Sequence, residues 1–150
     1  MTSFHLAQAN IAVSRFPLDA AEMEGFTSRI DEINAIADTV PGFVWRIPDD
    51  DAEERAQAVF GLERMVYNLT LWDSAESLGS FVYRSDHMDV MRQRASWFEP
   101  SERSPFVLWW VPAGHLPTIE ESRERFVRLW ENGPAPEAFT FKQRFDPPMT

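Results

Sequence analysis

The chain has 150 residues, of which 44% are hydrophobic and 25% are charged, and this is enough for one globular domain over residues 1–150. Its net charge of −10 repels phosphate groups and anionic lipids, so we expect no nucleic acid and no membrane among its partners. It has no cysteine, which excludes disulfides, thiolate metal sites and a cysteine nucleophile. Because it also lacks a signal-peptide pattern, we expect a cytoplasmic protein.

The N-terminal third has the pattern of a strand, a helix and a second strand. Residues 4–13 alternate, with apolar residues on one face and with Gln8 and Asn10 on the other, where they point either into a cavity or into solvent. A capping box at Asp19 predicts the start of a helix. Residues 43–47 then predict a short strand.

An acidic run, PDDDAEE, occupies residues 48–54. A calcium-binding EF-hand loop needs spaced ligands, a central glycine and a closing glutamate, and this run lacks that pattern. We therefore interpret the run as a solvated loop.

Two further strands are predicted in the second half of the chain. Residues 63–72 carry large side chains on both faces, so this strand should be covered on both. Residues 106–111, FVLWWV, are also apolar on both sides and need the same double cover. A last helix should begin at the capping box of Thr118 and end at Gly133.

The stretch SDHMDVMRQRASWF, residues 85–98, is the most specific feature of the chain. A single helix through it, at about 100° per residue, would put His87, Met91, Arg94 and Phe98 on one face. Since buried polar groups are costly unless paired, this face should line either a pocket or an internal polar contact. In the first case His87 would move a proton and Arg94 would hold an anionic oxygen. In the second, the two side chains would only fix the helix to the sheet.

Other candidate binding residues lie on neighbouring elements. Asn68, with Gln8 and Asn10, could complete a polar patch on the sheet, although each alone is more often structural. Tryptophan side chains could wall the pocket or simply pack in the core. The expected binding set is Asn68, Trp72, Met91, Trp97, Phe98 and Trp109.

The order of elements, β, α, β, β, α, β and a further helix, predicts an α+β protein with a ferredoxin-like antiparallel sheet and helices on one face. The other face would then need a partner, as the doubly apolar strand at residues 106–111 also indicates. A two-fold homodimer that closes two sheets face to face, a dimeric α/β barrel, would supply it.

Three segments carry a resemblance to a known family: WDSAESLGSFVYRSDHMDVMRQRASWF, FVLWWVPAGHLPTIEESRERF and PEAFTF. They resemble an uncharacterised bacterial family of the dimeric α/β-barrel superfamily, which includes the antibiotic-biosynthesis monooxygenases. The resemblance implies the barrel fold. Relatives in that superfamily include cofactor-free oxygenases, haem-using enzymes, isomerases and stress proteins, so it implies no single activity.

Two classes of function follow. The first is a small-molecule site that binds an apolar, aromatic or polyketide-like ligand, as in a cofactor-independent monooxygenase or isomerase. The second is a non-catalytic dimeric binding or stress-response protein. An enclosed cavity that touches His87 and Arg94 would favour the first class, and solid packing the second. We expect no cofactor and no metal, because the three histidines have no HxxxH or HExxH spacing, and haem bound at His87 ranks below an organic ligand.

Overall fold

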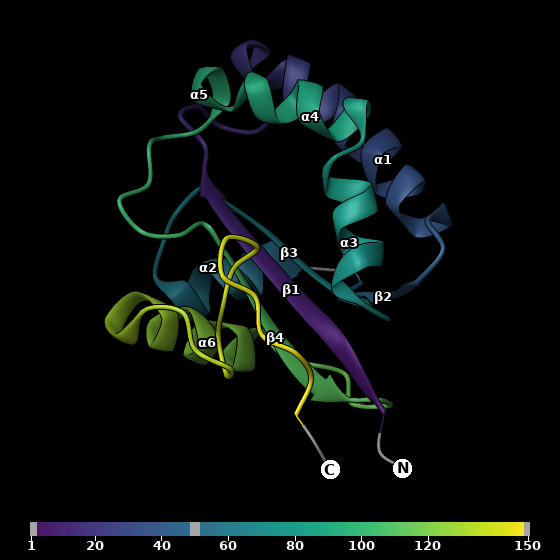
Figure 1. Cartoon of the computed structure of the whole chain (residues 1–150). Helices are drawn as coiled ribbons and strands as arrows, with labels where there is room; N and C mark the ends of the chain where they lie inside the picture. Colours follow the sequence, from purple (N-terminus) through teal and green to yellow (C-terminus); the bar gives the residue numbers. More distant parts are fainter. Residues whose placement is uncertain (1–2, 49–51, 149–150) are drawn as a thin grey trace.

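The computed structural model describes residues 3–48 and 52–148, and a four-stranded antiparallel sheet lies at its centre (Figure 1). The long strand β1 is central and pairs with both β3 and β4. The strands lie in the order β2-β3-β1-β4 and are β1 (Phe4–Val13), β2 (Phe43–Arg46), β3 (Met65–Trp72) and β4 (Phe106–Pro112). The prediction of an α+β fold with an antiparallel sheet is confirmed.

One face of the sheet is covered by α2 (Ala52–Phe60) and α6 (Ile119–Asn132), as Figure 1 shows. Phe126 of α6 is fully buried there, in one cluster with alternate residues of three strands. Those strand residues are Ala7, Ala9, Met65, Tyr67, Leu69, Leu71, Val107, Trp109 and Val111. Their strict alternation is what a strand period of two residues requires of a buried face.

The expectation that helices cover one face only is wrong, because both faces of β4 are covered within a single chain. The error arose mainly at α2, whose two fully buried residues are the small alanines Ala52 and Ala56, so its apolar stripe is weak in the sequence. The last residues of the acidic run form the first turn of α2, where glutamates favour the helix dipole. Residues 49–51 of that run lie outside the described residues.

The helix α6 follows its prediction. The Thr118 side chain accepts a hydrogen bond from the backbone nitrogen of Glu121 at 3.0 Å, as a capping box requires. Gly133 ends the helix with a φ of 77°, a conformation that glycine adopts without steric cost.

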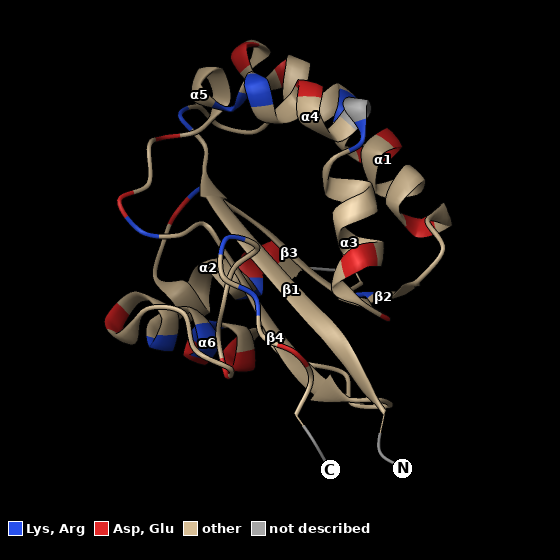
Figure 2. Ribbon diagram, viewed as in Figure 1, with Lys and Arg blue, Asp and Glu red and all other residues tan. Residues whose placement is uncertain are grey.

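The opposite face lies beneath an arch of helices, visible at the top and right of Figure 1. Trp72, Leu78 and Leu108 belong to one buried cluster on this side, and Met23 and Phe26 belong to another. Figure 2 shows that charged residues gather on helices and loops, whereas β1 carries none. The arch consists of the 3-10 turn η1 (Ala21–Met23) with α1 (Glu24–Thr39), α3 (Ala75–Val82), α4 (Ser85–Arg92) and α5 (Arg94–Trp97).

The stretch predicted as one helix over residues 85–98 is two helices. Gln93, with φ −96° and ψ 3°, ends α4, and α5 begins at the next residue. The change of direction brings the Trp97 ring to 5.7 Å from that of Phe26, between centroids, in a buried cluster. His87 and Arg94 therefore lie on different helices, and the expected stacking of the two along one helix face is wrong.

Candidate functional site

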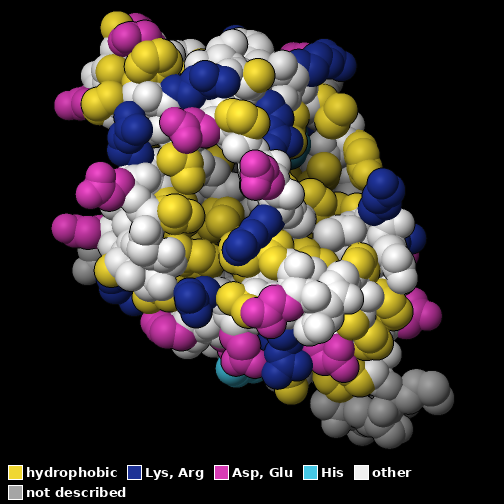
Figure 3. Space-filling model, turned by 90° about the vertical axis from the view of Figure 1, so that its left-hand side faces the viewer, with side chains coloured by type: hydrophobic (Ala, Val, Ile, Leu, Met, Phe, Trp, Pro, Cys, Tyr) yellow, Lys and Arg dark blue, Asp and Glu magenta, His cyan; other side chains and the backbone are white. Residues whose placement is uncertain are grey.

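A pocket of ≈ 760 Å³ lies between the sheet and the helical arch, a size typical of small-molecule sites. Figure 3 shows the hollow, walled mainly by hydrophobic side chains. Phe26 comes from α1 and Phe81 from α3, whereas Phe98 lies at the end of α5 and Phe106 at the start of β4. The strands β1, β2 and β3 make the floor of the pocket, and residues of α2 and α6, such as Trp130, also line it.

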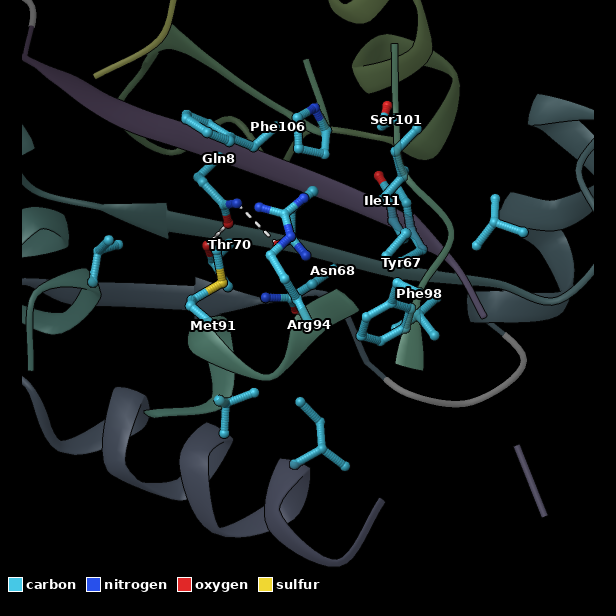
Figure 4. A pocket seen from close by; sticks show the side chains of 18 of the residues that line it. Gln8, Ile11, Tyr67, Asn68, Thr70, Met91, Arg94, Phe98, Ser101 and Phe106 are labelled. Carbon is cyan, nitrogen blue, oxygen red and sulfur yellow. Dashed lines mark hydrogen bonds between the residues drawn. The ribbon is translucent and has the colours of Figure 1, made fainter. Parts of the chain in front are cut away.

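The floor carries a row of hydrogen-bonded polar side chains. Gln8 lies opposite Thr70 in the β1–β3 register, and Asn10 lies opposite Asn68. The Trp72 indole donates to the Thr70 hydroxyl at 2.9 Å, and that hydroxyl donates to the Gln8 carbonyl oxygen at 3.0 Å. The Gln8 amide nitrogen then donates to the Asn10 carbonyl oxygen at 2.9 Å (Figure 4).

Arg46, on the edge strand β2, joins this floor to α1. Its Nη1 donates to the side-chain oxygen of Asn68 at 2.9 Å, and its Nη2 lies 3.2 Å from Oδ1 of Asp38. The side chain is only 17% exposed. A charged group in this position is costly unless paired, and the two partners together satisfy it while fixing the orientation of Asn68.

His87 lines the pocket from α4. Its Nδ1 lies 3.0 Å from the backbone oxygen of Val82, and its ring packs 5.0 Å from the Phe81 ring, between centroids. Because a carbonyl oxygen can only accept, Nδ1 carries the proton and Nε2 carries the lone pair. Burial lowers the pKa of His87 below its ordinary value of 6.5, and the hydrogen bond to Val82 opposes this only in part. The imidazole is therefore neutral at neutral pH, with Nε2 able to accept a proton.

Arg94 also lines the pocket, but its environment differs from that of Arg46. Its side chain is exposed, and no hydrogen bond or ion pair holds its guanidinium to any residue in the part of the chain that the structure describes. In Figure 4 it reaches from α5 across the pocket toward the strands that carry Gln8 and Asn68. A guanidinium in this position can form a bidentate pair of hydrogen bonds with a ligand carboxylate or a similar oxygen group.

The predicted binding residues separate into two groups. Asn68, Trp72, Met91 and Phe98 line the pocket together with His87 and Arg94. Trp97 lies instead in the buried cluster beside Phe26.

Trp109 lies on the opposite face of the sheet, where its indole donates to the Glu121 carboxylate at 2.9 Å. Strand alternation puts Trp109 and its neighbour Trp110 on different faces, and the packing of α6 decides which face Trp109 takes.

Two contributors to the site were not predicted. Arg46 pairs with Thr70 in the β2–β3 register, and its role depends on Asn68, which is 22 residues away. Its one sequence signal is a basic residue within a short strand that is otherwise apolar. Phe81, whose ring stacks on Trp72 and contacts the His87 ring at a tilt, carries no signal that separates it from an ordinary core residue.

Metal and membrane features were also sought. Among the residues whose side chains the structure describes, no three histidine, aspartate or glutamate residues form a group that could hold a metal ion. Among the same residues, no helix is both long enough and apolar enough to cross a membrane.

The fold and the pocket define an α+β protein with a site of small-molecule size, and comparison with known proteins places it in a family. The chain matches the model of the domain of unknown function DUF3291 over residues 5–150 and belongs to that family. Among solved structures it is similar to the crystal structure of PA3566 from Pseudomonas aeruginosa, with 10% sequence identity and a TM-score of 0.42. That match covers 78% of this chain and 97% of PA3566. Curated proteins give no significant match.

Proposed function

We propose that the protein binds a small aromatic or otherwise apolar molecule that carries an anionic oxygen. The observation that supports this is the Arg94 guanidinium, which faces the pocket without a partner among the described residues. Phe81, Phe98 and Phe106 give flat apolar surface around it. An apolar wall with a few convergent polar groups is the usual chemistry of a small-molecule site.

The site also supports a reaction class, proton transfer at carbon. A C–H bond next to a carbonyl group would break, Nε2 of His87 would take the proton, and the electron pair would move onto the carbonyl oxygen, which Arg94 would hold as an enolate. In an isomerase the proton returns to a different carbon. In a cofactor-independent monooxygenase the carbanion reacts with dioxygen, so that a CH₂ group becomes C=O and the second oxygen atom leaves as water.

Binding is tested with a matched pair of ligands, 2-naphthoate and the neutral 2-naphthylmethanol, by calorimetry. Hydrogen bonds to charged groups contribute about 1.5–3 kcal/mol, so the carboxylate should bind at least about tenfold tighter than the alcohol. In Arg94→Met this preference should fall while the affinity for the alcohol is kept. Equal preference in the wild type and the variant would contradict the proposal.

Proton transfer is tested with 2-tetralone, a ketone with acidic C–H bonds, in deuterated buffer. Proton NMR should show exchange at the carbons next to the carbonyl in the presence of the wild-type protein. His87→Gln should lose this exchange, because glutamine can still donate to Val82 but cannot take the proton. Tight naphthoate binding without any exchange would favour the second candidate, a non-catalytic binding or stress-response protein. The observation in favour of that candidate is the structural bond of His87 to Val82.

We also infer a ferredoxin-like topology and a homodimer. The strand order β2-β3-β1-β4, with β1 between β3 and β4, supports the first. The homodimer has less support from the structure than from the sequence, because α2 and α6 already cover the face that a barrel dimer was expected to bury. Sedimentation at micromolar concentration tests the dimer, and a monomer would contradict both the dimer and the dimeric α/β barrel.

A further inference from the structure

We propose that the side-chain amides of Asn10 and Asn68 form a seat for a negatively charged ligand oxygen, facing Arg94 across the pocket. The inference rests on the proposed small-molecule function and names the group that the pocket selects: an oxygen that only accepts hydrogen bonds, such as an enolate, a phenolate or a carboxylate. Asn10 and Asn68 are directly opposite each other on β1 and β3, and both line the pocket. Opposed side chains of this kind have Cβ atoms about 4.5–5.5 Å apart.

The orientation of Asn10 is set by a chain of hydrogen bonds that begins at Trp72. An indole N–H can only donate, so the Thr70 hydroxyl accepts from it and uses its own proton on the Gln8 oxygen. Gln8 must then present its nitrogen to the Asn10 oxygen. The Asn10 Nδ2 is left facing the pocket with no hydrogen-bond partner in the described chain.

The orientation of Asn68 is set independently from the other side. A guanidinium can only donate, so the Asn68 oxygen must face Arg46, at 2.9 Å. Asp38 holds Arg46 in place at 3.2 Å. The Asn68 Nδ2 is therefore the free end of this second series of hydrogen bonds, and it too has no partner among the residues described.

Both series of hydrogen bonds end in the same way. Amide N–H groups lie at the pocket surface, and the side-chain oxygens of the floor already accept hydrogen bonds from other residues. Arg94 adds further donors from the opposite side (Figure 4). Four acidic residues also line the pocket, and all but Glu53 are exposed at its rim. These four are Asp31, Glu53, Glu99 and Glu102. The floor is thus a surface of donors fixed in advance, which is the requirement for stabilising an oxyanion.

The test uses 4-nitrophenol, whose phenolate is yellow and whose neutral phenol is nearly colourless. Donors and a cation around the oxygen favour its charged form, so the pKa of bound nitrophenol should fall by about one unit or more relative to the free compound. Asn10→Leu and Asn68→Leu should each move this pKa back toward the free value. Thermal melts of the two variants check that they are folded.

Trp72→Phe tests the chain of hydrogen bonds itself, because it keeps an aromatic ring at this position and removes the indole N–H that sets the direction of the hydrogen bonds. Trp109→Phe is the matched control, since Trp109 is equally buried but donates to Glu121 on the opposite face of the sheet. The first change should raise the pKa of bound nitrophenol and the second should leave it unchanged.

The possible failures are distinguishable. If nitrophenol binds and its pKa falls, but Asn10→Leu and Asn68→Leu do not change that pKa, the amide seat is wrong while the proposed function stands on Arg94 alone. If folded protein binds neither nitrophenol nor naphthoate, both proposals are overturned. An equal effect of Trp72→Phe and Trp109→Phe on the pKa of bound nitrophenol would contradict the role of the hydrogen bonds that run from Trp72 to Asn10.

Discussion

The Nδ1 atom of His87 lies 3.0 Å from the backbone oxygen of Val82, so a residue expected to serve chemistry is also a structural tie between α4 and the end of α3. One ring nitrogen is used by the fold, and the other is left for the pocket. This division predicts two separable effects of mutation, on stability and on proton transfer.

The stability of the protein should depend on pH through His87. Because burial lowers the pKa of His87 in the folded state, the unfolded chain binds a proton first as the pH falls below about 6.5. The free energy of unfolding should therefore fall as the pH drops from neutrality toward the folded-state pKa. His87→Gln should lack this part of the decrease. Urea unfolding of both proteins over this pH range measures it, and parallel curves would contradict the buried neutral imidazole.

Arg94 and Arg46 should respond oppositely to the same substitution. Arg94→Met should leave the free energy of unfolding nearly unchanged, because its guanidinium has no partner among the described residues. Arg46→Met should cost about 1–3 kcal/mol, because it leaves the Asn68 oxygen on the pocket floor without a donor. Denaturant melts of the two variants provide the comparison. A large loss of stability in Arg94→Met would contradict an unpartnered guanidinium at this position.

Gly42 and Gly79 form a second matched pair. A Cβ at Gly42 would clash with the Ser77 side chain, and the backbone φ there is +97°, so Gly42→Ala should destabilise the protein by more than about 1 kcal/mol. Gly79 lies within α3, and a Cβ there meets no described atom within 4 Å. Gly79→Ala should stabilise the protein by about 0.5–1 kcal/mol. Thermal melts measure both changes in stability. If the melting temperature moved in the same direction in both variants, the packing of α3 against the turn before β2 would be contradicted.

Tyr67 should remain protonated in strongly alkaline solution. Burial, the main cause, raises its pKa well above the ordinary value of 10, and its hydroxyl donates to Ser122, whose own proton goes to the Ile119 carbonyl oxygen. In the folded state the wild type and Tyr67→Phe should therefore give the same tyrosinate absorbance as the pH is raised. Since the unfolded chain ionises first, stability due to Tyr67 is present below about pH 10 and is lost above it. A larger tyrosinate signal from the folded wild type would show that Tyr67 is accessible.

The sequence by itself determined which residues share a face of each strand. The period of two residues in β1 puts Gln8 and Asn10 together on one face, with Ala7 and Ala9 on the other, and the structure has this arrangement. It also determined the limits of α6, because the cap at Thr118 and the stop at Gly133 are local interactions. Whether Gln8 and Asn10 faced solvent or a cavity could not be decided from alternation alone.

Only the tertiary structure decided what covers each face and what each polar side chain meets. The helix break at Gln93, the cover of the second face by α2 and α6, and the placement of Trp109 away from the pocket all depend on contacts between distant parts of the chain. Arg46 shows the reason most directly: it joins Asp38 to Asn68, and no periodicity or motif links three residues at that spacing. Local sequence specifies the direction of a side chain within its element. The partner of that side chain is specified by the packing of whole elements, which local patterns do not contain.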